Sequence, residues 1–244
     1  MKIMSLNMWQ GRLERVLLKH LEASGVDFAC MQEAVQYDGQ SLGLISSHRK
    51  VGSSLGLDEQ FFSKIISSKL GDKELAFGNA TFSNIPFVQT NTIFTRGTYN
   101  SDFNLDKDDY NIRAFQHALV EINGRKLHIL NHHGHHIHAH KLGDDETMRQ
   151  VKQILEYIKH LEGSVILCGD FNLSPESDSI KLIDEKLINL SVEYKLSTTR
   201  SKLTHKNEVC DYIFVSNDVK VNSFVMDDAI ISDHNALILD FDIV

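Results

Sequence analysis

Apolar residues that recur every three or four positions predict where this chain forms helices. Two long amphipathic helices are predicted at residues 12–24 and 146–161. A further helix is predicted over residues 57–71, where large apolar residues lie about one helical turn apart. Ser174 and Pro175 have the character of an N-cap and first-turn pair, and they predict the start of a short helix.

Runs rich in apolar residues lie between these helices and predict buried strands. The predicted strands are residues 2–8, 26–33, several within 74–96 and 112–131, 164–172, 210–216 and 236–244. Strand–helix–strand units mix with strands that follow one another directly, so the pattern predicts an α/β protein with helices outside mixed sheets. The two prolines and the lack of a low-complexity tract favour a single domain over residues 1–244.

The composition is that of an ordinary globular protein. The 244 residues are 42% hydrophobic and 24% charged, and a chain of this length can bury a sizeable core. No apolar run approaches the roughly 20 residues of a membrane-spanning helix, and the segment MKIMSLNMWQ lacks a signal-peptide pattern. The three cysteines lie in apolar runs, so they are expected to be free and buried. These features predict a cytoplasmic protein without a membrane span.

The formal net charge of −8 argues against a surface that binds polyanions generally, because phosphate contacts depend on lysine and arginine. One segment departs from this balance. Residues 195–206 carry Lys195, Arg200, Lys202 and Lys206 without an acidic residue. A local basic groove that contacts nucleic acid is therefore compatible with the sequence.

Polar residues stand at the ends of many predicted strands. They are Asn7, Glu33, Asn131 to His133, Asp170, Asn172, Asp211, Asp233 and His234. Such groups are costly to bury unless they are paired or bind a cation. Their recurrence at strand ends predicts that they line one shared cleft.

Several short motifs follow one another along the chain, namely LNMW, MQE, GNATFSNIPF, NHHG, GDFN, DYIF and SDHNAL. In this order and spacing the sequence resembles the endonuclease/exonuclease/phosphatase family, from residue 3 to about residue 241. The family includes pancreatic deoxyribonuclease, abasic-site endonucleases, neutral sphingomyelinases, deadenylases and inositol polyphosphate 5-phosphatases. The resemblance implies a two-sheet α/β sandwich with outer helices, like that of deoxyribonuclease I, and a phosphate site at one edge.

Mapped by motif, the resemblance also implies a role for the polar residues. Glu33 would be the main ligand of a divalent cation, with Asn7 beside it and Asp233 helping to bind the metal. Asp170 would orient and deprotonate the attacking water. Asn172 would hold that water or a phosphate oxygen.

The remaining motif residues are implied to stabilise charge on the phosphate. His234 would stabilise the transition state, and Asp211 would fix the tautomer of His234. The NHHG motif puts Asn131 and His133 in the site, where His133 would donate to a phosphate oxygen. Strand alternation would point His132 the other way.

The expected chemistry also has a physical basis apart from the resemblance. Anionic oxygens of a phosphoester repel a nucleophile, so a hard cation and charged donors must neutralise them while a carboxylate activates water. Oxygen ligands such as Glu33, Asp170 and Asp233 suit Mg²⁺ or Mn²⁺ better than zinc. The expected activity is that of a metal-dependent phosphoric ester hydrolase that forms no covalent enzyme intermediate.

The sequence leaves the substrate open. The basic segment 195–206 narrowly favours a phosphodiesterase of nuclease type. Asn84 stands where the family usually has a basic residue, which argues against long duplex DNA. Arg113 and Arg96 are candidate substrate contacts that would compensate, but for isolated arginines a surface or ion-pair role is favoured. The alternative is a phosphatase or phosphodiesterase for small phosphorylated metabolites or lipid head groups. The sequence does not predict the oligomeric state.

Two other functional classes are less well supported. The stretch GSSLG matches a serine-hydrolase pattern, with Ser54, Asp211 and His234 in the order of a triad. The residues before it are too polar for the buried strand that a nucleophile elbow requires. A non-catalytic binding module is also disfavoured, because the chain keeps the metal carboxylates and the final Asp–His pair.

Two polar segments have alternative interpretations. Residues 101–113 resemble a calcium loop, but Lys107 replaces the required glycine and Arg113 replaces the closing glutamate, so a solvated acidic loop is expected. Four further histidines follow NHHG, namely His135, His136, His138 and His140. For these a solvated loop is favoured over contact with substrate at the cleft rim or adventitious metal binding.

Overall fold

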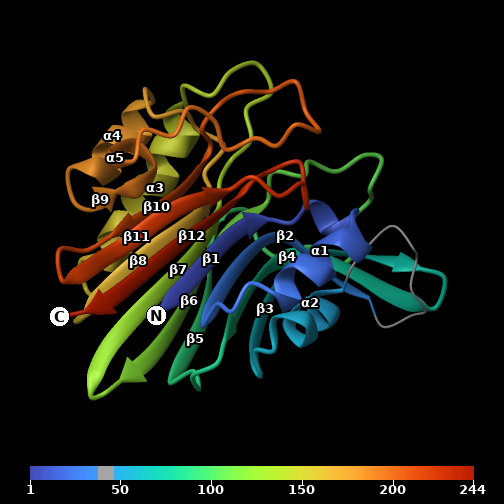
Figure 1. Ribbon diagram of the computed structural model, residues 1–244. Helices are drawn as coiled ribbons and strands as arrows, with labels where there is room; N and C mark the ends of the chain where they lie inside the picture. The colour runs from blue at the N-terminus through green and yellow to red at the C-terminus, as the bar shows by residue number, and fades with distance from the viewer. Residues whose placement is uncertain (38–46) are drawn as a thin grey trace.

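The computed structural model describes residues 1–37 and 47–244, and two mixed β-sheets lie face to face within it (Figure 1). In spatial order the first sheet contains β11 (Val219–Asp227), β12 (Ala236–Ile243), β1 (Lys2–Asn7), β2 (Phe28–Tyr37), β4 (Lys73–Ser83) and β3 (Glu59–Leu70). The second contains β5 (Gln89–Arg96), β6 (Arg113–Ile122), β7 (Arg125–His133), β8 (Ser164–Asp170), β10 (Asp211–Val215) and β9 (Ile188–Asn189).

Helices cover the outer faces of both sheets (Figure 1). They are α1 (Glu14–Glu22), α2 (His48–Leu55), α3 (Asp145–Ile158), α4 (Asp178–Asp184) and α5 (Leu190–Glu193), with a short 3-10 turn at Trp9–Gly11. Leu17 of α1 and Val51 of α2 pack against the first sheet. Ile154 of α3 and Ile180 of α4 pack against the second. The predicted two-sheet α/β sandwich with outer helices is therefore confirmed.

Alternation along the strands divides the core into apolar layers. In β1, Ile3 faces the other sheet, whereas Met4 faces α1 and α2. In β7, Ile129 lies between the sheets, whereas Leu130 faces α3 and α4. Because successive side chains of a strand point to opposite faces, each sheet is apolar on both sides. Burial of these layers is the main favourable contribution to folding.

The prediction of a helix over residues 57–71 is wrong. Glu59–Leu70 forms β3, which pairs with β4 in an antiparallel hairpin. A β-bulge between Lys64 and Ile66 leaves Ile65 and Ile66 both buried. The bulge interrupts the strict alternation that identifies a half-buried strand, so the apolar spacing resembled that of a helix.

The other helix predictions are confirmed with one correction. The long helices expected at 12–24 and 146–161 are α1 and α3. The short helix begins later than predicted, because Ser177 rather than Ser174 is its N-cap. The Ser177 side chain accepts a hydrogen bond from the backbone N–H of Ile180.

Two expectations about the chain as a whole can also be compared with the structure. None of the described helices is long and apolar enough to cross a membrane. Cys30, Cys168 and Cys210 are free and buried, as expected from the apolar runs that contain them.

A chain of buried side chains links the second sheet to α3. Tyr157 Oη lies 2.8 Å from His117 Nδ1, and His117 Nε2 lies 2.8 Å from His128 Nδ1. His128 Nε2 lies 3.2 Å from the carbonyl oxygen of Glu162. Because a carbonyl oxygen only accepts, His128 donates to Glu162, His117 donates to His128, and Tyr157 donates to His117. This direction requires both imidazoles to be neutral, and they are, because burial lowers the pKa of His117 to about 4 and that of His128 below its usual value.

We expect this network to make the fold sensitive to mild acid. The unfolded chain binds a proton at His117 near pH 6.5, whereas the folded chain does so only near pH 4, so the free energy of unfolding decreases as the pH falls through this interval. The slope is at most about 1.4 kcal/mol per pH unit for each histidine. Urea unfolding at about pH 7.5 and about pH 5.5 measures it. The difference between the two should be smaller in His117→Gln than in the wild type, and equal differences would contradict the assignment.

Candidate active site

Strand register brings polar side chains of the second sheet to one edge. Asp170 ends β8 and is paired with His133 of β7 on one side and Asp211 of β10 on the other. Counted by alternation from Ile129 in β7 and Cys168 in β8, these side chains face the first sheet. The layer between the sheets is thus apolar along most of its length and ends in polar groups at this edge.

The first sheet contributes Asn7 and Glu33 to the same cluster. Asn7 Nδ2 donates to Asp170 Oδ2 at 3.0 Å and to Glu33 Oε1 at 3.2 Å. Glu33 lies inside β2, at a β-bulge between Met31 and Ala34, with a backbone φ of +52°. Met31 and Ala34 both face the helices. The extra residue of the bulge turns the Glu33 side chain toward Asn7, and its left-handed backbone is a conformation that clusters at functional sites.

Asp170 lies at the centre of the cluster and is only 2% exposed. Its Oδ2 is 3.7 Å from His234 Nε2 and 3.9 Å from His133 Nε2, and its Oδ1 accepts from the backbone N–H of Asn172 at 2.9 Å. Burial alone would raise the pKa of Asp170, but the surrounding positive charges, led by that of His234, lower it far below its usual range. The carboxylate is therefore ionised at neutral pH.

Asp211 and His234 form a buried pair beside Asp170. Both carboxylate oxygens of Asp211 lie 2.9 Å from His234 Nδ1, and one of them accepts from Thr199 Oγ1 at 2.5 Å. The proton of the imidazole is thus fixed on Nδ1, and Nε2 faces Asp170. Burial lowers the pKa of His234, but Asp211 and Asp170 outweigh this effect and raise the pKa above its usual value.

Two cations of this cluster were not identified from the sequence motifs. Lys141 is 9% exposed, and its Nζ donates to Asn172 Oδ1 at 2.8 Å. Arg200 is 7% exposed, and its Nη1 contacts His234 Nε2. The sequence placed Arg200 in a basic segment for nucleic acid, whereas the side chain is directed into the site. Its only sequence signal is a run of small polar neighbours, STTRS, and Lys141 has none beyond its place after the histidine run.

Close backbone packing explains the glycines of NHHG and GDFN. A Cβ on Gly169 would lie 1.8 Å from the carbonyl oxygen of His132, and one on Gly134 would lie 2.3 Å from that of Phe171. Asn172 has a φ of +57°, a left-handed conformation that asparagine adopts more readily than most residues. The turn after β8 therefore brings the backbone N–H of Asn172 to Asp170 Oδ1.

The structure does not bring Asn131 into contact with the cleft. Its side chain is fully buried, and Nδ2 donates to the carbonyl oxygens of Met31 and Ala80. Its Oδ1 accepts from Gln32 Nε2 at 2.7 Å. Asn131 thus joins the two sheets beneath the site. His132, as expected, points away and packs its ring against Phe171.

Arg113 lies close to the cluster but is largely occupied by the backbone. Its Nε donates to the carbonyl oxygen of Gly134 at 2.6 Å, and its Nη1 donates to that of Tyr110 at 2.7 Å. Burial lowers its pKa to about 10, although Glu33 and Asp170 act in the opposite direction. The guanidinium therefore remains charged at neutral pH and braces two loops beside the site.

The carboxylates around Glu33 fit a hard divalent cation. Burial raises the pKa of Glu33, and the charges of Asp233 and Asp170 raise it further against the hydrogen bond from Asn7. Acidic groups that disfavour one another's ionisation are stabilised together by a divalent cation. Within residues 1–37 and 47–244, one compact group of potential metal ligands is found, with ligand atoms of Asp170, Asp211 and His234 within 4.8 Å of one another; Glu33 does not belong to this group.

The competing interpretations do not fit the structure. Ser54 lies inside α2, on the outer face of the first sheet, so it follows no strand and forms no triad with Asp211 and His234. The loop that resembled a calcium site is closed by its own hydrogen bonds, such as that from Asp106 N to Asn104 Oδ1 at 3.0 Å, and is largely exposed.

The histidine run is divided by the structure. His138 and His140 are exposed, as expected of a solvated loop. His135 is partly buried, with Nδ1 3.2 Å from Arg96 Nη1, and His136 is also partly buried. In the part of the chain that the structure describes, none of these histidines belongs to a group that could hold a metal ion.

A sandwich whose inner layer ends in carboxylates, amides and imidazoles has the groups that phosphoester hydrolysis requires. The model of the endonuclease/exonuclease/phosphatase family matches residues 4–234. The chain therefore belongs to this family, whose members hydrolyse phosphoester bonds, and it is a phosphoric ester hydrolase. Among curated proteins, none matches the sequence at a significant level.

Solved structures of the same fold are similar over the whole chain. A family member from Leptotrichia buccalis has a TM-score of 0.72 and 16% identity, with 99% of each chain covered. The human Nocturnin catalytic domain with bound sulfate has a TM-score of 0.70 and 18% identity, covering 100% of this chain and 94% of that one. A mannosyl-6-phosphatase from Bacteroides thetaiotaomicron has a TM-score of 0.68 and 14% identity, with 99% of each chain covered. At these identities the likeness shows the fold alone.

We expect Arg200 to contribute to turnover although no motif contains it. Arg200→Met removes a buried donor that contacts His234, so kcat/KM for a chromogenic phosphodiester with Mg²⁺ should fall by about 100-fold. The matched control is Lys202→Met, an exposed cation of the same segment, which should retain activity within about twofold. Circular dichroism of both variants checks that the fold is kept. Equal activities in the two variants would contradict a role for Arg200.

Proposed function

We propose that this chain hydrolyses a phosphodiester by direct attack of a water molecule oriented by Asp170. The observation that supports this most strongly is the ionised, almost fully buried Asp170 carboxylate with two imidazole Nε2 atoms directed at one of its oxygens. Burial lowers the pKa of His133, so this imidazole is a neutral donor, whereas His234 and Arg200 bring positive charge. A buried acceptor among such donors can hold both a water molecule and the phosphate that it attacks.

We assign the divalent cation, Mg²⁺ or Mn²⁺, to Glu33, with Asp233 as a further ligand and Asn7 beside them. When bound, such a cation would withdraw charge from a phosphate oxygen and make a bound water more acidic. Asp211 is a poor ligand for it, because its oxygens are engaged by His234 and Thr199. Only oxygen donors are assigned to the position, and oxygen donors are preferred by both metals.

The remaining groups orient water and carry charge on the phosphate. The low pKa of Asp170 makes it a weak base, so we propose that it accepts the proton of the water only as the new bond to phosphorus forms and the bond from phosphorus to the leaving oxygen breaks, with the leaving oxygen taking a proton from solvent. The raised pKa of His234 favours its protonated form, and we propose that Nε2 donates to a phosphate oxygen once substrate takes the place of the Arg200 contact. His133 donates to a second oxygen, and Lys141 holds Asn172 toward the same region.

The structure favours a small substrate over a polynucleotide. Arg200, counted from the sequence as part of a basic groove, is directed into the site instead. Asn84 donates to the Asp27 carboxylate at 2.7 Å and lies beside the start of β2, at the opposite end of that strand from Glu33, so the missing basic residue there does not bear on the choice of substrate. A nuclease-type activity is the second candidate, supported by the exposed Lys202 and Lys206. A cytoplasmic location stays a prediction of the sequence.

Asp170→Asn should reduce kcat by at least about 1,000-fold, because it removes the acceptor of the water proton while keeping the shape of the side chain. The thermal unfolding midpoint should decrease, because the low pKa of Asp170 means that its charge stabilises the fold and its loss leaves the positive charges of His234, Arg200 and Lys141 uncompensated, so circular dichroism checks that the variant is still folded. Glu33→Gln should instead raise the concentration of Mg²⁺ needed for half-maximal rate. Undiminished hydrolysis by Asp170→Asn would contradict the mechanism.

A substrate panel distinguishes the two candidate functions. Plasmid DNA, short RNA, bis-p-nitrophenyl phosphate and p-nitrophenyl phosphate are compared with Mg²⁺ and with Mn²⁺, using Glu33→Ala as the metal-site control. We expect turnover of the small diester, lost in the control. Efficient cleavage of a nucleic acid would favour the nuclease. Inactivity on every substrate with either metal would favour a non-catalytic binding module.

A further inference from the structure

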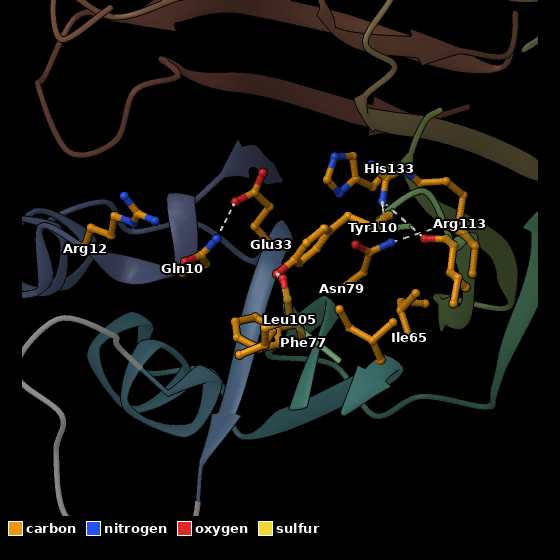
Figure 2. A pocket seen from close by; sticks show the side chains of 14 residues that line it. Gln10, Arg12, Glu33, Ile65, Phe77, Asn79, Leu105, Tyr110, Arg113 and His133 are labelled. Carbon is orange, nitrogen blue, oxygen red and sulfur yellow. Dashed lines mark hydrogen bonds between the residues drawn. The ribbon is translucent and has the colours of Figure 1, made fainter. Parts of the chain in front are cut away.

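A cavity of ≈ 460 Å³ adjoins the proposed reaction centre. Glu33 and His133 line one side of it, whereas Ile65, Phe77 and Leu105 line the other, as Figure 2 shows. Its volume lies within the range of pockets that bind small organic molecules, about 300–1,000 Å³. The cavity therefore leads from the phosphate position into a largely apolar space.

The apolar side of the cavity is built before any ligand binds. The loop of residues 97–112 supplies Leu105, Tyr110 and Ile112 to its wall. This loop is fixed to β3, because Ser67 N donates to Asn100 O at 2.8 Å and Phe103 N donates to Ser67 O at 2.9 Å. The Phe103 side chain is 2% exposed within the small apolar cluster that also contains Ile65 and Ile66. Because these contacts fix the loop to β3, the apolar wall keeps its shape and the cavity stays open without a ligand.

A strained turn borders the polar side of the cavity. Trp9, Gln10 and Gly11 have consecutive φ values of +48°, +59° and +70°, so the chain makes a left-handed turn directly after β1. Such a conformation costs on the order of 1 kcal/mol for each residue other than glycine, and it persists where the surroundings require it. The turn directs Gln10 Nε2 to Glu33 Oε2 at 3.3 Å. It also leaves the Arg12 guanidinium exposed over the Trp9 ring, at 4.8 Å, at the edge of the cavity.

We propose that this cavity binds an apolar, ring-sized organic group of the substrate, while the phosphate attached to that group lies at Asp170, Glu33 and His234. This inference rests on the proposed function and specifies the class of its substrate. The apolar wall excludes a bare sugar, because hydroxyl groups held against isoleucine, leucine and phenylalanine would lose their hydrogen bonds to water. Arg12 and Arg113 flank the polar side and complement the negative charge of the phosphate.

Asn79 gives the cavity one polar position inside its wall. Its side chain is 2% exposed, and Nδ2 donates to the carbonyl oxygen of Ala114 at 3.3 Å, which fixes the orientation of the amide. In the described part of the chain no donor is bonded to its Oδ1. An aromatic group that carries one hydrogen-bond donor therefore fits the cavity better than a plain hydrocarbon chain.

The test measures binding rather than turnover. Isothermal titration calorimetry with Mg²⁺ compares methylphosphonate, 2-hydroxyethylphosphonate, phenylphosphonate and dodecylphosphonate, which keep the charged head and change only the organic group. We expect phenylphosphonate to bind at least about tenfold more tightly than methylphosphonate, the gain from burying roughly two methylene equivalents. The hydroxyethyl compound should bind no better than the methyl compound. Tightest binding of the dodecyl compound would overturn the assignment of a ring-sized group and would indicate a lipid chain instead.

A matched pair of variants locates the effect. Leu105 and Leu70 are 43% and 44% exposed, and only Leu105 lines the cavity. In Leu105→Asn the preference for phenylphosphonate over methylphosphonate should fall to about twofold or less, and in Leu70→Asn it should be unchanged. Ile112→Asn, on the same wall, should act like Leu105→Asn.

The outcomes separate this inference from the proposed function. Equal binding of all the phosphonates, no binding by any of them, or a phenyl preference that survives in Leu105→Asn and Ile112→Asn would overturn the subsite. Each of these results would leave hydrolysis of phosphoesters, measured separately, unaffected. Conversely, an inactive protein that still prefers phenylphosphonate through Leu105 would contradict the proposed chemistry and support the cavity.

Discussion

The Asp170 carboxylate is buried at the end of a layer that is otherwise apolar, and much of the surrounding structure offsets the cost of that charge. Asn7 crosses from the opposite sheet to donate to it, while Lys141 and Arg200 bring positive charge from two loops. Together with His234, the two cations lower the pKa of Asp170 against the effect of burial and keep the carboxylate ionised. Both sheets and two loops converge on this edge because an ionised group that is buried away from water needs partners for its charge.

Regular alternation and local irregularity contribute different parts of the site. Alternation along β1, β7, β8 and β10 brings Asn7, His133, Asp170 and Asp211 to the inner layer. Alternation alone would turn Glu33 away from the inner layer, because Glu33 lies an odd number of residues after the inward-facing residues of β2. The bulge and the left-handed backbone at Glu33 correct its direction, and the left-handed turn at Trp9–Gly11 then supplies Gln10 as a partner. The left-handed backbone positions of this region thus orient one carboxylate, that of Glu33, and supply its hydrogen-bond partner.

Features set by neighbouring residues could be predicted from the sequence, whereas features set by residues far apart in the chain could not. The strand ends and their motifs were predictable, because alternation and local turns are encoded by neighbouring residues. The β3 strand was not, because its bulge is set by pairing with β4. Lys141 and Arg200 were not identified, since loops bring them to the site without any periodic pattern. Asn131 lies on the same inner face of β7 as His133, but it is two residues further from the end of the strand. Its side chain therefore lies beneath the site rather than in it.

The groups assigned to catalysis and the apolar wall of the cavity come from different parts of the fold. The groups assigned to catalysis are held at strand ends and in the turns after them, whereas the apolar wall of the cavity comes from the β3–β4 hairpin and loop 97–112. Arg113 connects the two parts, because it donates to Gly134 beside the site and to Tyr110 in the loop. Changes at Leu105 or Tyr110 can therefore alter the shape of the cavity while Asp170 keeps its place between β7 and β10. A sandwich of this kind can change its substrate without rebuilding the buried charge on which its chemistry depends.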